Sequence, residues 1–550
     1  MKDRRRLVKN IHGVSLPQLP NEVVRNARKT RLDAFAVAVE GWRRGLKLKW
    51  YTKDSEHFDD MIIFGVNPPG RLFSLSSDKR THYFFRTRGD KVANEAVELV
   101  DDKGTTKELL DQANVPVPKG KGFPAEATDE EILEFGKTIG YPVVLKPTNA
   151  SLGDGVVVNI MSDEELEDAL NYVRYELEYD EIIVEQHVFG KEYRIYVVED
   201  KAVAAYNRIP ANITGDGIHT IEELIDMKNY ERRQNARLNS CLIHYDVEIE
   251  EFLERKKYDL TSIPPKGEYI PLREKTNVSA GGDPIDVTDI ITDEMREIAI
   301  NAVKAIPGLY HAGVGVIVNE EAENPAVVLE INATAQIGGI LFPLRGKARN
   351  IPAAIIDYYF PETKGMDTTD SKVYFDMSTV LEPMENRSAI EVEVQQAPMG
   401  TLYARRYIVT GNVDSESYHR WLKYKALDRG LHGHINQLMF DEIEIVVAST
   451  DESAVINFKE VIDQYTRGVR VRRIRTEHYN KHVTVGFDII EMYNPTNMRS
   501  ARRAYRQMEK EKIRLERRRN RVAKDIYHIE NSTSWNITQP LRKLKRIFER

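Results

Sequence analysis

The stretch AVVLEINATAQIGG, residues 326–339, largely decides how this chain can fold around a site. Apolar residues lead up to Glu330 and Asn332, after which small residues and glycines break the pattern. Side chains two positions apart on a strand point to the same face of the sheet. A carboxylate and an amide on one face supply the oxygen ligands that a hard cation such as Mg²⁺ takes. A solvated strand end at a turn has the same local pattern, so this stretch alone leaves both interpretations open.

Length and composition indicate a large protein of a reducing compartment. A chain of 550 residues exceeds one ordinary core, so about three or four structural units are expected. The single cysteine, Cys241, excludes a disulfide within the chain. The apolar runs are far shorter than the roughly 20 residues that cross a bilayer, and the basic start has no apolar segment behind it. We therefore expect a cytoplasmic protein.

The charge is distributed unevenly along the chain. The net charge is −7, yet residues 499–550 hold 17 Lys and Arg against 6 Asp and Glu, so the remainder carries −18. An acidic body argues against nucleic-acid binding by the body, whereas the basic tail suits an anionic surface or a solvated helix. Apolar residues at a spacing of three to four in this tail predict a helix, either a weak coiled coil that would make a homo-oligomer or a lone solvated helix.

The hydrophobic pattern predicts five regions. These are a mixed N-terminal region at 1–99, a larger α+β region at 100–365, a polar linker at 366–385, a small domain at 386–490, and the basic helical tail at 491–550.

Short periodic runs predict the elements of the first and fourth of these regions. In the N-terminal region we expect the segment 21–45 to be helical and strands at 61–66 and 71–75. The small domain has a βαββαβ pattern, which is a ferredoxin-like arrangement. Its expected strands are 403–409, 432–438, 442–448 and 469–474, and its expected helices are 415–430 and 452–465.

Two lysines and a glycine-containing loop are candidates for binding phosphate. Lys103 lies in VDDKGTTK, and Lys146 follows the apolar run of YPVVLKP. In the loop NASLGDGV, Gly153 and Gly155 would let backbone N–H groups approach an anion. Each feature has a simpler alternative, because lysines beside apolar strands often only extend into solvent and the loop could be a plain turn.

Two glutamates flank a strand-to-connector passage in EIIVEQHVFGKEYR. Glu185 lies near the end of an apolar strand, and Glu192 follows a short connector. Such a passage can offer backbone groups to a base such as adenine while a carboxylate binds ribose hydroxyls. A pair of exposed acids in a hairpin would have the same sequence pattern.

The order of these motifs resembles the ATP-grasp ligases. The resemblance covers about 95–361, and it is most similar to the ATP-grasp modules of cyanophycin synthetase and of the bifunctional glutamate–cysteine ligase/glutathione synthetase. The motifs that carry it are DK, VVLKP, GDGV, VEQHVFGKEYR, RIPANITGDGIHTIEELI, LREKTNVSAGGDPIDVTD and LEINA. The resemblance implies an ATP held between two α+β lobes. It also implies a reaction in which ATP phosphorylates a carboxylate and an amine then displaces phosphate from the acyl phosphate.

The resemblance also implies roles for individual residues. Those expected to bind the nucleotide are Lys103, Lys146 and Arg208 at the phosphates, Glu185 and Val188 at adenine, and Glu192 at the ribose. Those expected at the reacting groups are Arg273 and Asn277 near the γ-phosphate and the acyl group, with Glu330 and Asn332 as ligands of Mg²⁺.

One position departs from the pattern of that family. The family carries an acidic metal ligand one strand before the Glu–x–Asn strand, whereas the corresponding stretch HAGVGVIV has Gly315 at that place. Because the loss of a carboxylate removes a charged oxygen from a site that needs several, the departure puts catalytic competence in question more than nucleotide binding.

The small domain resembles acylphosphatase, in which a glycine-rich loop and an arginine hold phosphate. Here the loop reads VTGNVDSESYH, so Asp414 and Glu416 lie in the cradle and His419 takes the place of the arginine. Since two carboxylates repel a phosphate, we expect a domain that keeps the fold without the activity.

The final stretch, 531–548, resembles the C-terminal tails of some bacterial cell-surface polysaccharide enzymes. It suggests contact with envelope enzymes or with the inner face of the membrane. We therefore expect an ATP-dependent ligase that forms an amide between a carboxylate and an amino acid or peptide, in a setting of envelope-polymer synthesis. The alternative is a nucleotide-binding scaffold without ligase chemistry that recruits envelope enzymes.

Overall fold

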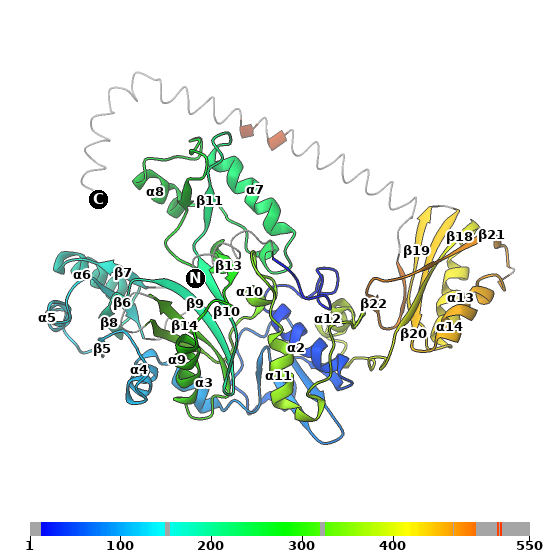
Figure 1. The fold of residues 1–550 in the computed structure, drawn as a ribbon, viewed down its shortest axis with the longest axis horizontal. Coiled ribbons are helices and arrows are strands. Elements are labelled where there is room, and N and C mark those ends of the chain that lie inside the picture. The colour runs from blue at the N-terminus through cyan, green and yellow to red at the C-terminus, as the bar shows by residue number, and fades with distance from the viewer. Residues whose placement is uncertain are drawn as a thin grey trace. The chain divides into compact units, whose positions relative to one another are not determined.

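The computed structural model describes residues 13–148, 155–319, 325–439, 441–465, 467–490, 514–515 and 518–519. It divides into two compact units, Met1–Leu402 with Asn480–Gly486 and Tyr403–Tyr479 with Phe487–Arg550. Helices and sheets are mixed in both units, as the expected α+β class requires (Figure 1). Gly153 and nearly all of the predicted tail lie outside the described residues. Within the described part, no helix is both long and apolar enough to cross a membrane.

An antiparallel sheet forms around the N-terminal core of the first unit. Its order is β17-β1-β2-β3-β4, so β17 returns from far along the chain to pair with β1. Helix α2 packs on β2 and against α11 (Figure 1), and Trp42, Trp50 and Phe73 are fully buried in the core. The bounds are α2 Arg31–Arg43, β1 Lys47–Tyr51, η1 Glu56–Phe58, β2 Leu72–Ser76, β3 Thr81–Phe85, β4 Arg88–Gly89, α11 Ile351–Tyr359, η5 Pro361–Thr363 and β17 Glu391–Glu393.

Two sequence expectations for this region need correction. The predicted strand at 61–66 does not form, because side chains satisfy its backbone: Ile62 N donates to Asn94 Oδ1 and Ile62 O accepts from Arg88. The stretch 366–385, expected as a linker, contains β16 (Val373–Tyr374) and α12 (Met377–Glu385). β16 pairs with β22 (Val483–Thr484), and the apolar face of α12 is buried in the N-terminal core.

A second, four-stranded sheet forms a small lobe with its own core. Its strands lie in the order β5-β8-β6-β7, and α5 and α6 pack together and on the sheet. Thr128 closes a capping box with Glu131 at the start of α5, which satisfies two backbone donors there. The bounds are β5 Gly120–Phe123, α5 Asp129–Ile139, β6 Val143–Pro147, β7 Val157–Ile160, α6 Asp163–Leu170, η2 Asn171–Glu176 and β8 Ile182–Gln186.

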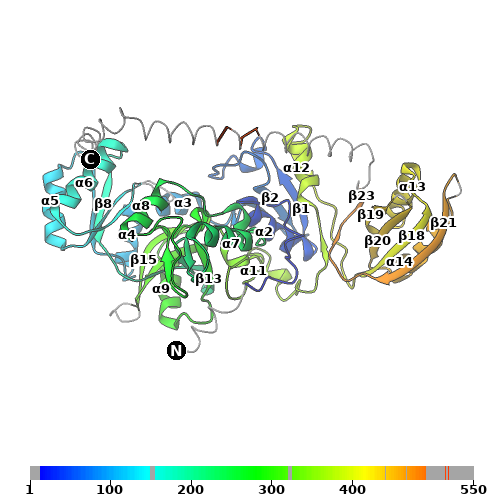
Figure 2. The same ribbon diagram turned by 90° about the horizontal axis from the view of Figure 1, so that it is seen from above.

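A third sheet, of five antiparallel strands in the order β13-β10-β9-β14-β15, lies at the centre of the first unit. Helix α9 packs on β9, β10, β14 and β15 (Figures 1 and 2). Ile195, Val197 and Val314 face α9, whereas Tyr196 and Tyr206 belong to the N-terminal core on the opposite face. The bounds are α3 Asn94–Asp101, α4 Lys103–Gln112, β9 Lys191–Val198, β10 Lys201–Ile209, β13 Asp283–Asp286, α9 Asp293–Lys304, β14 His311–Val318, β15 Ala326–Asn332 and α10 Gly338–Leu341.

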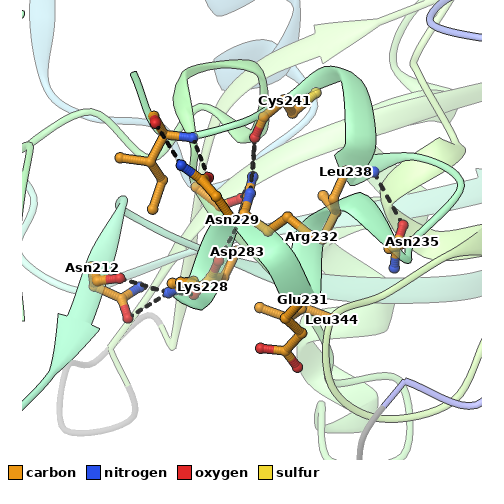
Figure 3. Close-up of polar contacts among 12 residues, drawn as sticks. Asn212, Lys228, Asn229, Glu231, Arg232, Asn235, Leu238, Cys241, Asp283 and Leu344 are labelled. Carbon is orange, nitrogen blue, oxygen red and sulfur yellow. Dashed lines mark hydrogen bonds and ion pairs between the residues drawn. The ribbon is translucent and has the colours of Figure 1, made fainter. Parts of the chain in front are cut away.

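A subdomain inserted between β10 and β13 is joined to the central sheet by buried charges. Asp283 of β13 accepts from Lys228 Nζ at 2.6 Å, Arg232 Nη1 at 2.8 Å and Asn212 Nδ2 at 2.8 Å (Figure 3). Arg232 also donates to the carbonyl of Cys241. The bounds are β11 Asn212–Thr214, α7 Ile221–Arg233, η3 Leu238–Ser240, α8 Val247–Arg255, β12 Tyr269–Pro271 and η4 Val278–Ala280.

The second unit has the predicted βαββαβ order. Its strands lie in the order β21-β18-β20-β19, with β23 added in parallel beside β19. Helices α13 and α14 pack together, and their buried residues share one core with the sheet. The bounds are β18 Tyr403–Asn412, α13 Glu416–Leu427, β19 His432–Met439, β20 Glu442–Ser449, α14 Glu452–Ile462, β21 Arg470–His478 and β23 Phe487–Ile490. All six predicted elements are confirmed, with small differences at their ends.

The Asp283 network predicts a stability effect. Asp283→Ala leaves Lys228 and Arg232 buried without their shared carboxylate, which should cost about 3–5 kcal/mol and lower the midpoint of thermal or urea unfolding. Asp293→Ala is the matched control, because the side chain of Asp293 is fully exposed, and we expect an unchanged transition. An equal shift in both variants would contradict a structural role for the network.

Candidate functional site

A β-bulge sets the direction of the Glu330 side chain. Ala326 and Val328 of β15 are buried in the core that faces α9, and strict alternation would bury Glu330 there as well. The pairing register shifts between Gly315 and Val316, where Val328 opposes Val316 but Glu330 opposes Gly315. After the shift Ile331 faces the core instead. The bulge therefore turns Glu330 and Asn332 to the face of the sheet away from α9.

A row of residues crosses four strands on that face. The register places Tyr206 of β10 opposite Arg194 of β9, Arg194 opposite Gly315 of β14, and Gly315 opposite Glu330. Arg194 forms an ion pair with Glu330 although β14 lies between their strands. A Cβ at position 315 would lie 2.9 Å from Glu330 Cγ. The missing side chain of Gly315 thus leaves the space in which arginine and carboxylate meet.

A second ion pair lies on the same face of the sheet. Arg208 of β10 pairs with Glu192 of β9, and the hydroxyl of Thr276 donates to the other oxygen of that carboxylate. Thr276 belongs to LREKTN, so this contact joins a distant loop to the central sheet. Burial lowers the pKa of Arg208.

Helix α4 and the small lobe together contribute a cluster of lysines around one buried carboxylate. Glu185 of β8 is 4% exposed, and it accepts from Lys146 Nζ at 2.5 Å and from Lys107 Nζ at 3.4 Å. Lys103, the first residue of α4, donates to the carbonyl oxygens of Pro147 and Thr148 at 3.3 and 3.4 Å. The two lysines singled out in the sequence, Lys103 and Lys146, therefore lie on neighbouring elements of one cluster.

Electrostatic interactions connect this cluster with the central sheet. The guanidinium of Arg194 lowers the pKa of the Glu330 carboxyl most strongly, and Arg208, Lys146 and Lys103 lower it further. Burial, followed by repulsion from Lys146, lowers the pKa of Lys103. The Glu330 side chain is still 43% exposed, so a solvent-accessible carboxylate lies within the field of cations from both sheets.

Other predicted site residues have different surroundings. Arg273 is buried and pairs with Asp246 and Glu248 at the start of α8, and no contact recorded for it among the described residues reaches the lysine cluster. Asn277 precedes η4, where its carbonyl accepts from Ala280 N and Gly282 N.

Val188 and Gly155 lie in connecting segments. Val188 is half-buried between β8 and β9. Gly155 has a φ of 63°, and a Cβ there would come within 2.8 Å of Pro147. This position therefore requires glycine for its backbone conformation and for its close approach to the end of β6.

Sequence reasoning missed three residues that the structure brings to the site. Lys107 is one helical turn after Lys103, and Arg194 is two residues after Glu192, so the periods of helix and strand could have indicated both. Thr276 has no comparable local signal, because its contact with Glu192 joins residues 84 positions apart.

The residues predicted to bind a metal ion provide few protein ligands. Among the described residues, no group of three or more His, Cys, Asp or Glu side chains could hold a metal ion. Glu330 offers one carboxylate, and the amide oxygen of Asn332 already accepts from Thr334 N at 3.0 Å. In phosphate-transfer sites Mg²⁺ typically takes one or two carboxylates, substrate phosphates and several waters. The residues present fit such a site and do not fit a cage built by protein alone.

In the second unit, Asp414 lies just before α13, and Glu416 and His419 lie in the first turns of that helix. His419 is buried and its Nε2 donates to the carbonyl of Val413 at 2.8 Å. Burial lowers the pKa of His419, which disfavours the positive charge that an arginine would carry at this position. Glu416 pairs with Arg420 at 2.5 Å. Lack of acylphosphatase activity stays a prediction for this domain.

Comparison with known proteins finds a similar domain for each of two regions of the chain. Residues 102–209 match the ATP-binding domain of the carbamoyl-phosphate synthase L chain, and residues 405–489 match acylphosphatase. The first region is therefore similar to an ATP-binding domain, and the second is similar to acylphosphatase.

Individual relatives match about half of this chain. Cyanophycin synthetase of Trichormus variabilis is 36% identical over 281 residues, which are 50% of this chain and 31% of the relative. The glutathione biosynthesis bifunctional protein of Listeria welshimeri is 32% identical over 294 residues, 52% of this chain and 37% of the relative. The crystal structure of a bifunctional glutathione synthetase from Pasteurella multocida covers 53% of this chain and 40% of its own, at 26% identity and a TM-score of 0.42. The chain thus spans about a third of the length of the curated relatives it matches.

The lowered pKa of Lys103 predicts a pH dependence of nucleotide binding. The ammonium attracts phosphate only while it is protonated, and it loses its proton at a lower pH than an ordinary lysine does. Affinity for a non-hydrolysable ATP analogue, measured by calorimetry, should therefore fall as the pH rises through this lowered pKa. Lys103→Arg keeps its charge and should remove much of that loss. If the affinity of the unmodified protein and that of Lys103→Arg fall equally at alkaline pH, the group that titrates is not Lys103.

Proposed function

We propose that the chain is an ATP-dependent ligase that joins a carboxylate to the amine of an amino acid or peptide. In the first step a carboxylate oxygen attacks the γ-phosphorus of ATP, which gives an acyl phosphate and ADP. In the second step the amine nitrogen attacks the acyl carbon, the C–O bond to phosphate breaks, and an amide, inorganic phosphate and a proton result. The observation that carries the proposal is that α4, which begins at Lys103, contacts β15, the strand of Glu330. Lysines of the same helix contact the end of β6 and Glu185 of β8, beside Lys146.

The cations would bind and neutralise the phosphates. Phosphoryl transfer depends on positioning and on charge stabilisation more than on covalent chemistry by the protein. Lys146 from the small lobe, Lys103 from α4 and Arg208 from the central sheet supply three positive groups for this purpose.

The remaining predicted residues would select the nucleotide and the substrates. Glu192 would bind ribose hydroxyls, since a carboxylate has about four acceptor sites and can keep its contacts with Arg208 and Thr276. Glu185 and the backbone near Val188 would face adenine. Arg273 and Asn277 would act near the acyl group, although the ion pairs of Arg273 with α8 support a structural role equally well.

Glu330 and Asn332 would hold Mg²⁺ together with nucleotide phosphates. When bound, the ion would neutralise charge on the transferring phosphoryl group. Arg194 would lie beside the same carboxylate as the metal ion, because it forms an ion pair with Glu330. Its guanidinium lowers the pKa of Glu330, which favours the ionised form that a metal ligand needs.

The class of amide product, the cellular setting and the oligomeric state are further parts of the proposal. The names of the relatives support amide-forming synthetases as a class. A setting in envelope-polymer synthesis at the inner face of the membrane rests on residues 531–548, which lie outside the described residues. A homo-oligomer built by the tail rests on that region as well.

Turnover tests the proposed chemistry. With ATP, Mg²⁺ and a panel of amino acids and carboxylates, the protein should release ADP and phosphate together with an amide product. Lys146→Ala and Glu330→Ala should each lower the rate by about a hundredfold or more, a loss typical for one electrostatic contact to a transition state. Lys137→Ala, on the outer helix of the same lobe with a half-exposed side chain, is the matched control. Unchanged release in the two site variants would show that the assigned mechanism is wrong.

A nucleotide-binding scaffold is the second candidate, and Gly315 favours it. The acidic metal ligand of the family is missing at this position, and the remaining carboxylate, Glu330, already forms an ion pair with Arg194. Such a protein would bind ATP with little dependence on Mg²⁺ and would release no phosphate.

Substitution at position 315 distinguishes the two candidates. If the protein is a ligase, Gly315→Asp should lower the Mg²⁺ concentration needed for half-maximal turnover, because it adds a charged oxygen next to Glu330. Gly315→Asn has nearly the same size without the charge and serves as the control. If all three proteins release phosphate only at background rates and bind ATP equally well without Mg²⁺, the scaffold is the correct candidate.

A further inference from the structure

The outer strand of the second unit carries an unusual concentration of arginine. Five arginines lie within nine residues: Arg467, Arg470, Arg472, Arg473 and Arg475. All five are exposed. The strand that contains most of them, β21, pairs with β18 and is the last strand of its sheet among the described residues (Figure 2).

A register shift turns these arginines away from the helices. Val471 and Ile474 both pack against the core under α13 and α14, although residues three apart on a regular strand face opposite sides. The pairing with β18 shifts between Thr410 and Gly411, which accommodates the extra residue. The arginines between and beside these two apolar residues consequently all point outward.

Among the described residues, only two of the five arginines form ion pairs, although Asp414 and Asp441 line the same surface hollow as Arg470. Arg472 pairs with Asp441 at 2.8 Å and Arg475 with Glu477 at 2.9 Å. In the described part of the chain, no ion pair or hydrogen bond involves the side chains of Arg467, Arg470 or Arg473. Their mutual repulsion is a cost that an anionic partner would relieve.

We propose that β21 binds an extended acidic polypeptide by addition of a strand to this edge of the sheet. An edge strand presents backbone N–H and C=O groups that another strand can pair with. In an added strand, alternate side chains point to the same face, so carboxylates at every second position would reach the outward arginines. The positive charge of the arginines and the unpaired backbone groups of β21 thus both favour an extended acidic polypeptide as the partner.

Two features favour a polypeptide over a nucleic acid. Residues 467–477 include no aromatic side chain on which bases could stack. A phosphate backbone also cannot supply the alternating donors and acceptors that the edge of a strand pairs with. The proposal does not depend on the ligase chemistry, because it concerns only the second unit.

Binding of a defined peptide to the full-length protein tests the proposal. The probe is a fluorescent ten-residue peptide of alternating Glu and Thr, and its anisotropy is measured at low and at physiological ionic strength. The double variant Arg470→Glu/Arg473→Glu should weaken binding about tenfold or more. Lys459→Glu/Arg429→Glu changes the net charge equally on other parts of the same unit and should leave the affinity within about twofold.

Three further ligands separate strand addition from simple charge attraction. They are the same peptide with every backbone nitrogen methylated, polyacrylate of matched charge, and oligo(dT) of matched length. Strand addition predicts much weaker binding of all three. If any of them binds as tightly as the peptide, or if the Arg470→Glu/Arg473→Glu variant binds like the unmodified protein, the proposal is wrong. Absence of peptide binding would mean that the arginines only protect the edge from aggregation.

Discussion

The candidate site depends on one irregularity, the β-bulge in β15 opposite Gly315 and Val316. Upstream of it, Val328 is part of the core that faces α9. If the strand continued without the bulge, the Glu330 carboxylate would enter that apolar core, where burying an unpaired charge costs several kcal/mol. With the bulge, Glu330 lies on the opposite face, beside Arg194 and within the field of the lysines. One extra residue in a strand therefore decides whether the chain has a core defect or a charged site.

The site also depends on balanced charges from separate parts of the chain. Lys146 is held by Glu185, Arg208 by Glu192, and Glu330 by Arg194. Each pair joins different strands, so the ion pairs position side chains that the local sequence leaves flexible. Gly315 has a double effect, because it stands where the resemblance to the ATP-grasp ligases predicts a carboxylate, and because it leaves the space through which Arg194 reaches Glu330. The same glycine is thus central to both the ligase and the scaffold as candidates.

Local patterns predicted much of the fold. The six elements of the second unit followed from the periodic spacing of their apolar residues, since each buries one face against a single core. The strand expected at 61–66 was wrong because side chains of Asn94 and Arg88 take its backbone hydrogen bonds. The segment 366–385 was interpreted as a linker because its polar start obscured the spacing of Met377, Leu381 and Met384, which bury α12 in a distant core.

The site was predictable only in part. Because Glu330 and Asn332 are two residues apart on a strand, the sequence predicted that they share one face of the sheet. Local alternation could not show which face, because the bulge is defined by the pairing of β15 with β14. Resemblance to the ATP-grasp ligases supplied Lys103, Lys146 and Arg208, whose surroundings the sequence could not give. Contacts such as that of Thr276 with Glu192 have no local signature, since packing between distant segments creates them.

The central claim is that cations from the small lobe and the central sheet bind one triphosphate whose metal ion is held by Glu330. A crystal structure with a non-hydrolysable ATP analogue and Mg²⁺ tests it most directly. We predict phosphate oxygens within hydrogen-bonding distance of Lys103, Lys146 and Arg208, and a metal ion on the Glu330 carboxylate. A nucleotide bound elsewhere, or bound there with Glu330 still paired to Arg194 and no metal ion beside it, would contradict the account.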